Sequence, residues 1–83
     1  SYYLRMFDMK SAEAFRENMR RRRRELGWTQ TDLALKMQCS QPYVAGIEAG
    51  RSIPTLDVVD RVAGALKCQS ATLLMPVMNP EPV

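Results

Sequence analysis

The stretch TQTDLALKMQCSQPYVAGIE, from Thr29 to Glu48, decides how the rest of the chain must fold. Thr29 can cap a helix, and Asp32 three residues later completes a capping-box pair. Apolar residues then recur at one-turn spacing, which predicts a first short helix with one buried stripe. The residues of that stripe are Leu33, Ala34 and Met37.

A tight turn at Gln38 and Cys39 leads into a second short helix. Ser40 can cap this helix, and Pro42 falls in its first turn, where a missing N–H has little effect. The residues that point inward are Val44 and Ile47. Helices this short are not stable alone in water, so the flanking segments must provide a surface on which they pack.

These residues resemble, position by position, the helix-turn-helix of the phage repressor and Cro family of transcriptional regulators. The resemblance extends from about Phe15 to Leu74, through LGWTQ before the motif and IEAGRSIPTLDVV after it. Small Ala34 falls where the two helices of the family cross. The matching apolar positions are Leu33, Met37, Cys39, Val44 and Ile47. The resemblance implies an all-α, five-helix, lambda-repressor-like DNA-binding domain.

One position departs from the family pattern. The family usually has glycine in the turn, where φ is positive, and in this chain Gln38 occupies that place. A residue with a Cβ atom raises the free energy of that backbone conformation by about 1 kcal/mol.

The length and basic composition of the chain favour one small domain that binds a polyanion. The chain has 83 residues and a net charge of +3, and its pI is about 9.2. No apolar run is long enough to span a membrane and nothing resembles a signal peptide, so we expect a cytosolic location. The chain has no histidine, so its two cysteines cannot form a usual zinc site, and we expect no cofactor.

The two cysteines occupy similar places, in MQCS and LKCQS, each directly before a predicted helix. In the family that the chain resembles, such places usually hold valine. We interpret Cys39 and Cys68 as small buried hydrophobic residues. A disulfide or a redox switch remains the alternative.

The chain divides into three segments. Residues 1–10, SYYLRMFDMK, form an N-terminal extension for which a short strand, a tag remnant and a disordered arm all remain open. Residues 11–75 hold the helix-turn-helix domain. Residues 76–83 contain three prolines, which predicts an extended or disordered tail. The missing initiator methionine and the proline-rich end leave open that a sensor domain has been cut away.

A first helix is predicted from Ser11, which can cap it, to Leu26, with Phe15 and Met19 near its apolar face. The run Arg20–Arg24 lies on this helix, and three or four of its five side chains are expected to form a solvated charged face. Arg23 falls close to the apolar face and needs an anion if it is buried. The acidic candidate is Glu48, because the family often pairs an Arg and a Glu at these two places.

Two further helices are predicted after the motif. Gly50 can end the second motif helix, and Thr55 can cap the next. Ser70 is expected to cap a last short helix, ATLLM, which Pro76 ends. The apolar stripe between them is Leu56, Val59, Val62, Ala63 and Leu66.

The resemblance implies that the first motif helix spans the DNA backbone and that the second enters the major groove. Gln30, at the positive end of the first motif helix, is expected to donate to a phosphate, as it commonly does in the family. Arg51, just past the second helix, is the best-placed phosphate clamp, with Ser52 beside it. The expected phosphate contacts are Thr29, Gln30, Arg51 and Ser52.

The outward face of the second helix predicts sparse base readout. Gln41, Tyr43 and Ser40 are its only polar candidates, and glutamine can pair with adenine through two hydrogen bonds. Pro42 and Ala45 can touch a thymine methyl group. Gly46 allows close approach. A face that has lost its reading residues is the alternative.

The resemblance implies a homodimer on half-sites roughly 34 Å apart, bound to double-stranded DNA as a regulator, with repression the expected direction. Four C-terminal residues exceed what the core should need and are the dimer candidates: Leu74, Met75, Val77 and Met78. An ordinary core with a floppy tail is the alternative. We expect no enzyme, no membrane and no small-molecule ligand. A protein-interaction module on the same scaffold, antitoxin-like or a coactivator, is the competing function.

Overall fold

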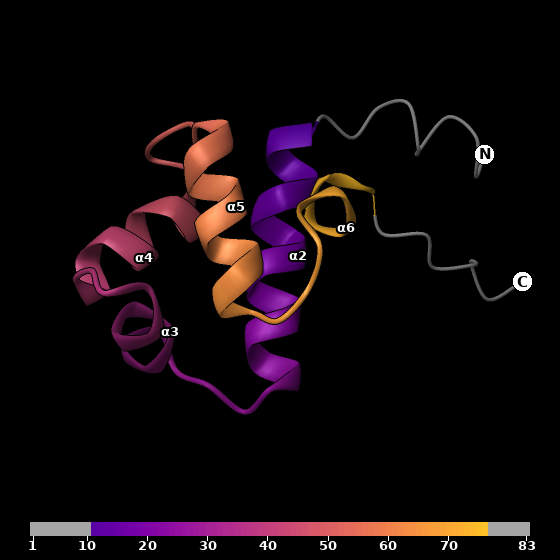
Figure 1. Ribbon diagram of the computed structural model, residues 1–83. Helices are drawn as coiled ribbons and strands as arrows, with labels where there is room; N and C mark the ends of the chain where they lie inside the picture. The colour runs from indigo at the N-terminus through magenta and orange to yellow at the C-terminus, as the bar shows by residue number, and fades with distance from the viewer. Residues whose placement is uncertain (1–10, 77–83) are drawn as a thin grey trace, which may run out of the picture.

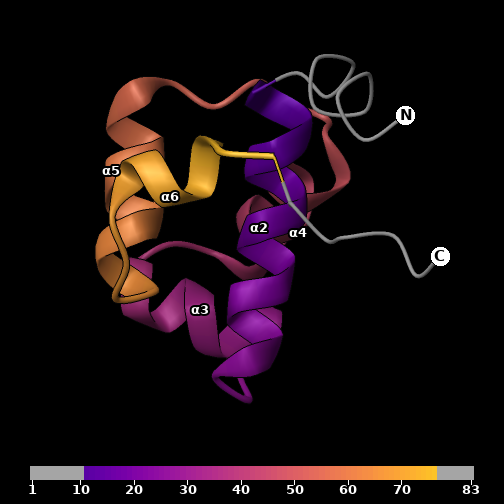
Figure 2. The same ribbon diagram turned by 90° about the vertical axis from the view of Figure 1, so that its right-hand side faces the viewer.

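The computed structural model describes residues 11–76, which form five helices and, over that range, no strand. In chain order they are α2 (Ser11–Glu25), α3 (Gln30–Met37), α4 (Gln41–Ala49), α5 (Leu56–Ala65) and α6 (Ser70–Leu74). Figure 1 shows α2 running through the middle of the molecule, with α3 and α4 on one side and α6 on the other. Figure 2, turned by 90°, shows α6 lying across α5 and α2. The predicted all-α, five-helix architecture is confirmed.

The core is formed by one apolar stripe from each helix. Phe15 and Met19 of α2 are fully buried, and around them pack the stripes of α3, α4, α5 and α6. Leu56 does not join them, because it stands at the first position of α5, beside the exposed loop, and 76% of it is accessible. Its predicted place in the stripe was wrong. The remaining core residues are Ala14, Leu33, Ala34, Met37, Val44, Ile47, Val59, Val62, Ala63, Leu66 and Leu73.

Four helices end in the same local geometry, with a residue of positive φ one or two places beyond the last turn. These residues are Gly27, Gln38, Gly50 and Lys67, with φ of 75°, 56°, 78° and 59°. In each case the next residue donates its N–H to a carbonyl five residues back, as Cys39 does to Ala34 at 2.9 Å. The positive φ expected at Gln38 is confirmed.

Side chains from distant helices complete these ends. The last carbonyls of a helix have no partner within the helix and need a donor from elsewhere. Arg61 donates to Met37 at the end of α3, at 2.7 Å. Arg20 donates to the carbonyl of Glu48 in α4, at 3.0 Å, and Arg22 to that of Leu66 after α5, at 3.1 Å. The Asn18 amide nitrogen serves α6 in the same way, 2.9 Å from the carbonyl oxygen of Leu73.

Three of the five arginines are therefore cross-helix braces, and only Arg21 and Arg24 are exposed, fewer than the three or four predicted. Arg20, Arg22 and Arg23 donate hydrogen bonds to other helices or to the following turn, and Arg21 donates to the side chain of Asn18. Arg24 is exposed. Packing with sequence-distant helices decides this, so the run itself contains no signal for it.

The cap of α6 also differs from the prediction. The residue before the helix is Gln69, and its side chain makes no cap hydrogen bond. Ser70 is already helical, and its hydroxyl lies 2.6 Å from the carboxylate of Asp60 on α5. The Ser70 hydroxyl therefore donates to a charged acceptor on α5 and does not cap α6 as expected. The extension 1–10 and most of the proline-rich tail lie outside the described residues.

Candidate nucleic-acid interface

The first turn of α3 is fixed by a complete capping box. The Thr29 hydroxyl accepts from the N–H of Asp32 at 3.0 Å, and the Asp32 carboxylate accepts from the N–H of Thr29 at 2.8 Å. The hydrogen bond from the Thr29 backbone, and then that with its side chain, hold the pKa of Asp32 below its ordinary value. N–H groups at the start of a helix favour an anion, so the N-terminus of α3 is a candidate phosphate site.

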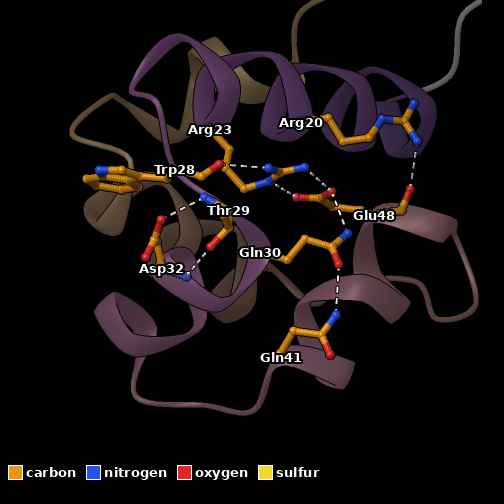
Figure 3. A network of polar contacts seen from close by, with 8 residues as sticks. All are labelled: Arg20, Arg23, Trp28, Thr29, Gln30, Asp32, Gln41 and Glu48. Atoms are coloured by element: carbon orange, nitrogen blue, oxygen red, sulfur yellow. Dashed lines mark hydrogen bonds and ion pairs between the residues drawn. The ribbon is translucent and has the colours of Figure 1, made fainter.

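A chain of hydrogen bonds runs from the core to the start of α4 (Figure 3). The structure brings Arg23 and Glu48 together as a buried ion pair, with Nε 2.7 Å and Nη2 3.0 Å from the two carboxylate oxygens. The amide of Gln30 donates to the same carboxylate at 3.1 Å, and Gln41 donates to the side-chain oxygen of Gln30 at 2.8 Å. The side chain at the first position of α4 is thus oriented by a buried charge two steps away.

These hydrogen bonds limit the donors and acceptors of Gln30 that remain free for a ligand. Its amide oxygen accepts from Gln41, and one amide hydrogen is used on Glu48. An amide nitrogen carries two hydrogens, so one donor is left for a phosphate. Gln30 is half-buried, whereas Gln41 is exposed.

The outward face of α4 is open and nearly apolar. Gln41, Pro42 and Tyr43 are exposed, while Ala45 and Gly46 are half-buried. The Ser40 hydroxyl caps the helix by accepting from the N–H of Tyr43 at 3.2 Å, as predicted. Sequence reasoning missed Ala49, which is exposed one turn beyond Ala45 and Gly46 on the same face; the helical spacing would have found it.

Two arginines lie against the glycines that flank the end of α4. Arg51 and Ser52 are exposed in the loop after the helix. The Arg51 Nε lies 3.9 Å from where a Cβ atom of Gly46 would stand. Arg16 of α2 lies closer still to Gly50, with its Nε 3.0 Å from the equivalent point. Neither contact could be predicted from the sequence, because each depends on where the folded chain brings an arginine against a glycine that has no side chain.

A family model described as helix-turn-helix matches residues 19–73, which is more than half of the chain. The chain belongs to the Cro/C1-type helix-turn-helix family. The crystal structure of a hypothetical transcription factor, NHTF, from Neisseria has a similar fold, with 31% sequence identity and a TM-score of 0.75. The aligned region covers 78% of this chain and 75% of that one. A search of curated proteins gave no match.

Membership of the helix-turn-helix family makes the chain a DNA-binding regulator. The family's two motif helices correspond to α3 and α4. Within residues 11–76, no helix is both long enough and apolar enough to cross a membrane. Over the same range, no three His, Cys, Asp or Glu side chains gather as they would around a metal ion.

The predicted dimer residues of this helix-turn-helix protein divide between two environments. Leu74 is half-buried and packs against the core, whereas 58% of Met75 is accessible. Val77 and Met78 lie outside the described residues. Only Met75 is therefore available, among the described candidates, as a largely exposed apolar contact at the end of α6.

Both cysteines are free thiols, half-buried against the core. Each follows a residue of positive φ, Gln38 or Lys67, at a helix end of the same geometry. Burial raises the pKa of the Cys68 thiol, and the nearby charge of Arg22 lowers it by less. Cys68 is therefore protonated at neutral pH, which suits a packing residue better than a reactive one.

Proposed function

We propose that the protein is a sequence-specific, double-stranded-DNA-binding transcriptional repressor that places α4 in the major groove. One observation carries the proposal: Gln41 is exposed at the start of α4 and held at 2.8 Å by Gln30, at the start of α3. This pairing supports a role for Gln41 at base edges and for Gln30 at the DNA backbone. This role requires neither catalysis nor a cofactor, and a cytosolic location follows from it as an expectation.

Phosphate contacts are assigned to the two ends of the motif. Thr29 and Gln30 stand at the positive end of α3, where the helix dipole and free N–H groups favour an anion. Ser52 stands in the exposed loop beyond α4. Arg51, in the same loop, borders both the phosphates and the groove. The two ends grip the backbone on either side of the inserted helix.

Base contacts are few in this proposal. Gln41 pairs with adenine, and Ser40 and Tyr43 provide the remaining polar groups near the N-terminal end of α4. Pro42 and Ala45 meet thymine methyl groups, and Gly46 lets the backbone approach closely. Because so few groups can form hydrogen bonds, the shape and deformability of the DNA are expected to carry much of the selection.

The protein is proposed to bind as a homodimer. A single module of this size reads few base pairs, and a two-fold dimer places two α4 helices about one helical turn, ~34 Å, apart. Exposed Met75 at the end of α6, with Leu74, Val77 and Met78 around it, is the proposed contact.

A binding series on duplex DNA tests the proposal. Selection from a random-sequence pool should yield a two-fold symmetric site, and a base-by-base substitution scan should show large penalties at fewer than four positions per half-site. Penalties at four or more positions would contradict sparse readout.

The nearly apolar outward face of α4 also supports the competing function of a protein-interaction module. A gel shift with random duplex DNA in low salt separates the two. A DNA-binding protein should show weak nonspecific retention that salt removes. Complete absence of retention would favour the protein-interaction module.

A further inference from the structure

The C-terminal half of the α4 outward face has no side chain of its own that can form a hydrogen bond with a base. Val44 and Ile47 are buried, so Gly46 lies on the opposite side of the helix, together with Pro42 and Ala49. None of these three carries a hydrogen-bonding side chain. Gly46 itself is half exposed.

The Arg51 guanidinium lies beside Gly46 on this face of α4. Its Nε and Nη2 atoms are 3.9 and 4.0 Å from the position that a Gly46 Cβ would occupy. A Cβ atom at position 46 would therefore meet the guanidinium in ordinary van der Waals contact, so the guanidinium lies next to the space that Gly46 leaves open. Arg51 follows α4 in sequence, but its guanidinium lies back along the helix, beside Gly46 on the outward face of α4.

The backbone explains this return. Gly50 ends α4 with a φ of 78°, a conformation that glycine adopts without a Cβ penalty. The turn brings the Arg51 N–H to the carbonyl of Gly46, at 3.0 Å. Arg51 is thereby fixed directly beyond Gly46, and its side chain extends back over the turn of helix where no side chain obstructs it.

We propose that Arg51 reads a guanine in the major groove, acting as the donor that the C-terminal half of α4 lacks. This inference rests on the proposed insertion of α4 into the groove. An arginine fork can donate two hydrogen bonds to the O6 and N7 atoms of guanine, which is the commonest specific contact between proteins and DNA. The position of Arg51 in the sequence predicts a phosphate contact, but such a contact requires only a place in the loop and does not explain why the guanidinium lies over Gly46.

The two readers then have a defined spacing. Gln41 and Gly46 are five positions apart, which corresponds to about 7.5 Å along the helix axis. Because a helix in the major groove is inclined to the DNA axis, this distance along α4 places the guanine at a different base pair of the half-site from the adenine read by Gln41. Gly46 has a specific purpose in this arrangement, since a long side chain there would occupy the place of the guanidinium.

The test uses the full chain and the site selected from random DNA. Affinities of the wild type, Arg51→Ala and Arg51→Lys are measured on that site and on every single-base variant of it. Arg24→Ala is the matched control, because Arg24 is an exposed arginine on α2. In the wild type, replacing the guanine that Arg51 is proposed to read should weaken binding by about 10- to 100-fold. In Arg51→Ala that penalty should disappear, while the penalties at other positions remain.

Arg51→Lys separates the fork from the charge. Lysine keeps the charge but cannot reproduce the planar two-donor geometry, so the guanine penalty should fall while the salt dependence of binding stays close to that of the wild type. Met in place of Gly46 (Gly46→Met) should also reduce the guanine penalty, although Arg51 is still present.

Two results would overturn the assignment. Uniform weakening of Arg51→Ala on all sequences, with a salt slope lower by about one charge, would make Arg51 a phosphate clamp. An unchanged pattern of base preference in Arg51→Ala would remove it from recognition altogether. Either result leaves wild-type DNA binding intact and so spares the proposed function, whereas a wild type that retains no duplex overturns both.

Discussion

Arg23 of α2 holds the carboxylate of Glu48 on α4 through two hydrogen bonds, of 2.7 and 3.0 Å. Both side chains are buried, at 9% and 3% exposure, and the guanidinium also donates to the carbonyl of Trp28 at 2.8 Å. The pair joins the first helix to the helix proposed to read DNA. It also supplies the acceptor that orients Gln30.

Arg23→Met should lower the free energy of unfolding by about 3–5 kcal/mol, because it leaves the Glu48 carboxylate buried without its cation. Chemical denaturation at neutral pH measures this. Arg24→Met is the control; that side chain is exposed, so the change should stay within about 0.5 kcal/mol. The double variant Arg23→Met/Glu48→Met should recover much of the loss. Equal stability of Arg23→Met and the wild type would mean that the pair contributes nothing.

Gln38→Gly should stabilise the protein by about 1 kcal/mol. Gln38 has a φ of 56°, and glycine adopts this conformation without the clash of a Cβ atom. Gln38→Ala is the matched control, since alanine retains the Cβ and should give no gain. Thermal unfolding of the three proteins decides the matter, and a lower melting temperature for the glycine variant would contradict the prediction.

The α3 capping box should make stability depend on acid. The folded-state pKa of Asp32 is lowered from 3.8, so its contribution is fully present above that pH and is lost as the pH falls through the folded-state value. Asp32→Ala should therefore be less stable than the wild type at pH 7. The difference should shrink below pH 3.8. Urea unfolding at pH 7, 5 and 3 measures it, and a difference independent of pH would show that the carboxylate is not the source.

Gln30 and Gln41 should act as one unit in base recognition. Gln41→Ala should relax the preference at one A·T pair by about 1–3 kcal/mol. Gln30→Ala should relax the same preference, because it removes the acceptor that orients Gln41, and the double variant should lose no more at that pair than Gln41→Ala. The exposed neighbour Thr31, changed to alanine, is the control and should keep the preference. Additive losses would show that the two residues act independently.

Met75→Glu should dissociate the proposed homodimer without unfolding the domain. Met75 is largely exposed, so a charge there disturbs a partner more than the core. Light scattering at micromolar concentration should give the dimer mass for the wild type and the monomer mass for the variant. Arg24→Glu, at an exposed position on α2, should remain dimeric. A monomeric wild type at that concentration would remove the dimer proposal.

Features that depend on neighbouring residues could be predicted from the sequence. The caps of α3, α4 and α5 at Thr29, Ser40 and Thr55 are all present, because a capping side chain bonds to an N–H only three residues away. The positive φ at Gln38 and Gly50 follows in the same way from the local requirement of a helix end. The apolar stripes also hold, apart from Leu56 at the very start of α5.

Features that join distant segments of the chain could not be predicted from the sequence. The carbonyl that Arg20 caps belongs to Glu48, 28 residues on, and the one that Arg22 caps belongs to Leu66, 44 residues on. Ser70 likewise donates to Asp60 and does not cap α6, because folding brings this charged acceptor within reach across the α5–α6 interface. Five consecutive arginines look alike in sequence until packing gives each a different neighbour.

The sequence by itself thus determined where α3, α4 and α5 begin, which faces are buried and that the motif is a helix-turn-helix, since each depends on spacing within one or two turns. Only the tertiary structure decided which arginine completes which helix, how Glu48 orients Gln30 and Gln41, and that Arg51 lies over Gly46. Long polar side chains can reach many partners from one position, and the choice among them is made by whichever unpaired group the folded chain brings within hydrogen-bonding distance.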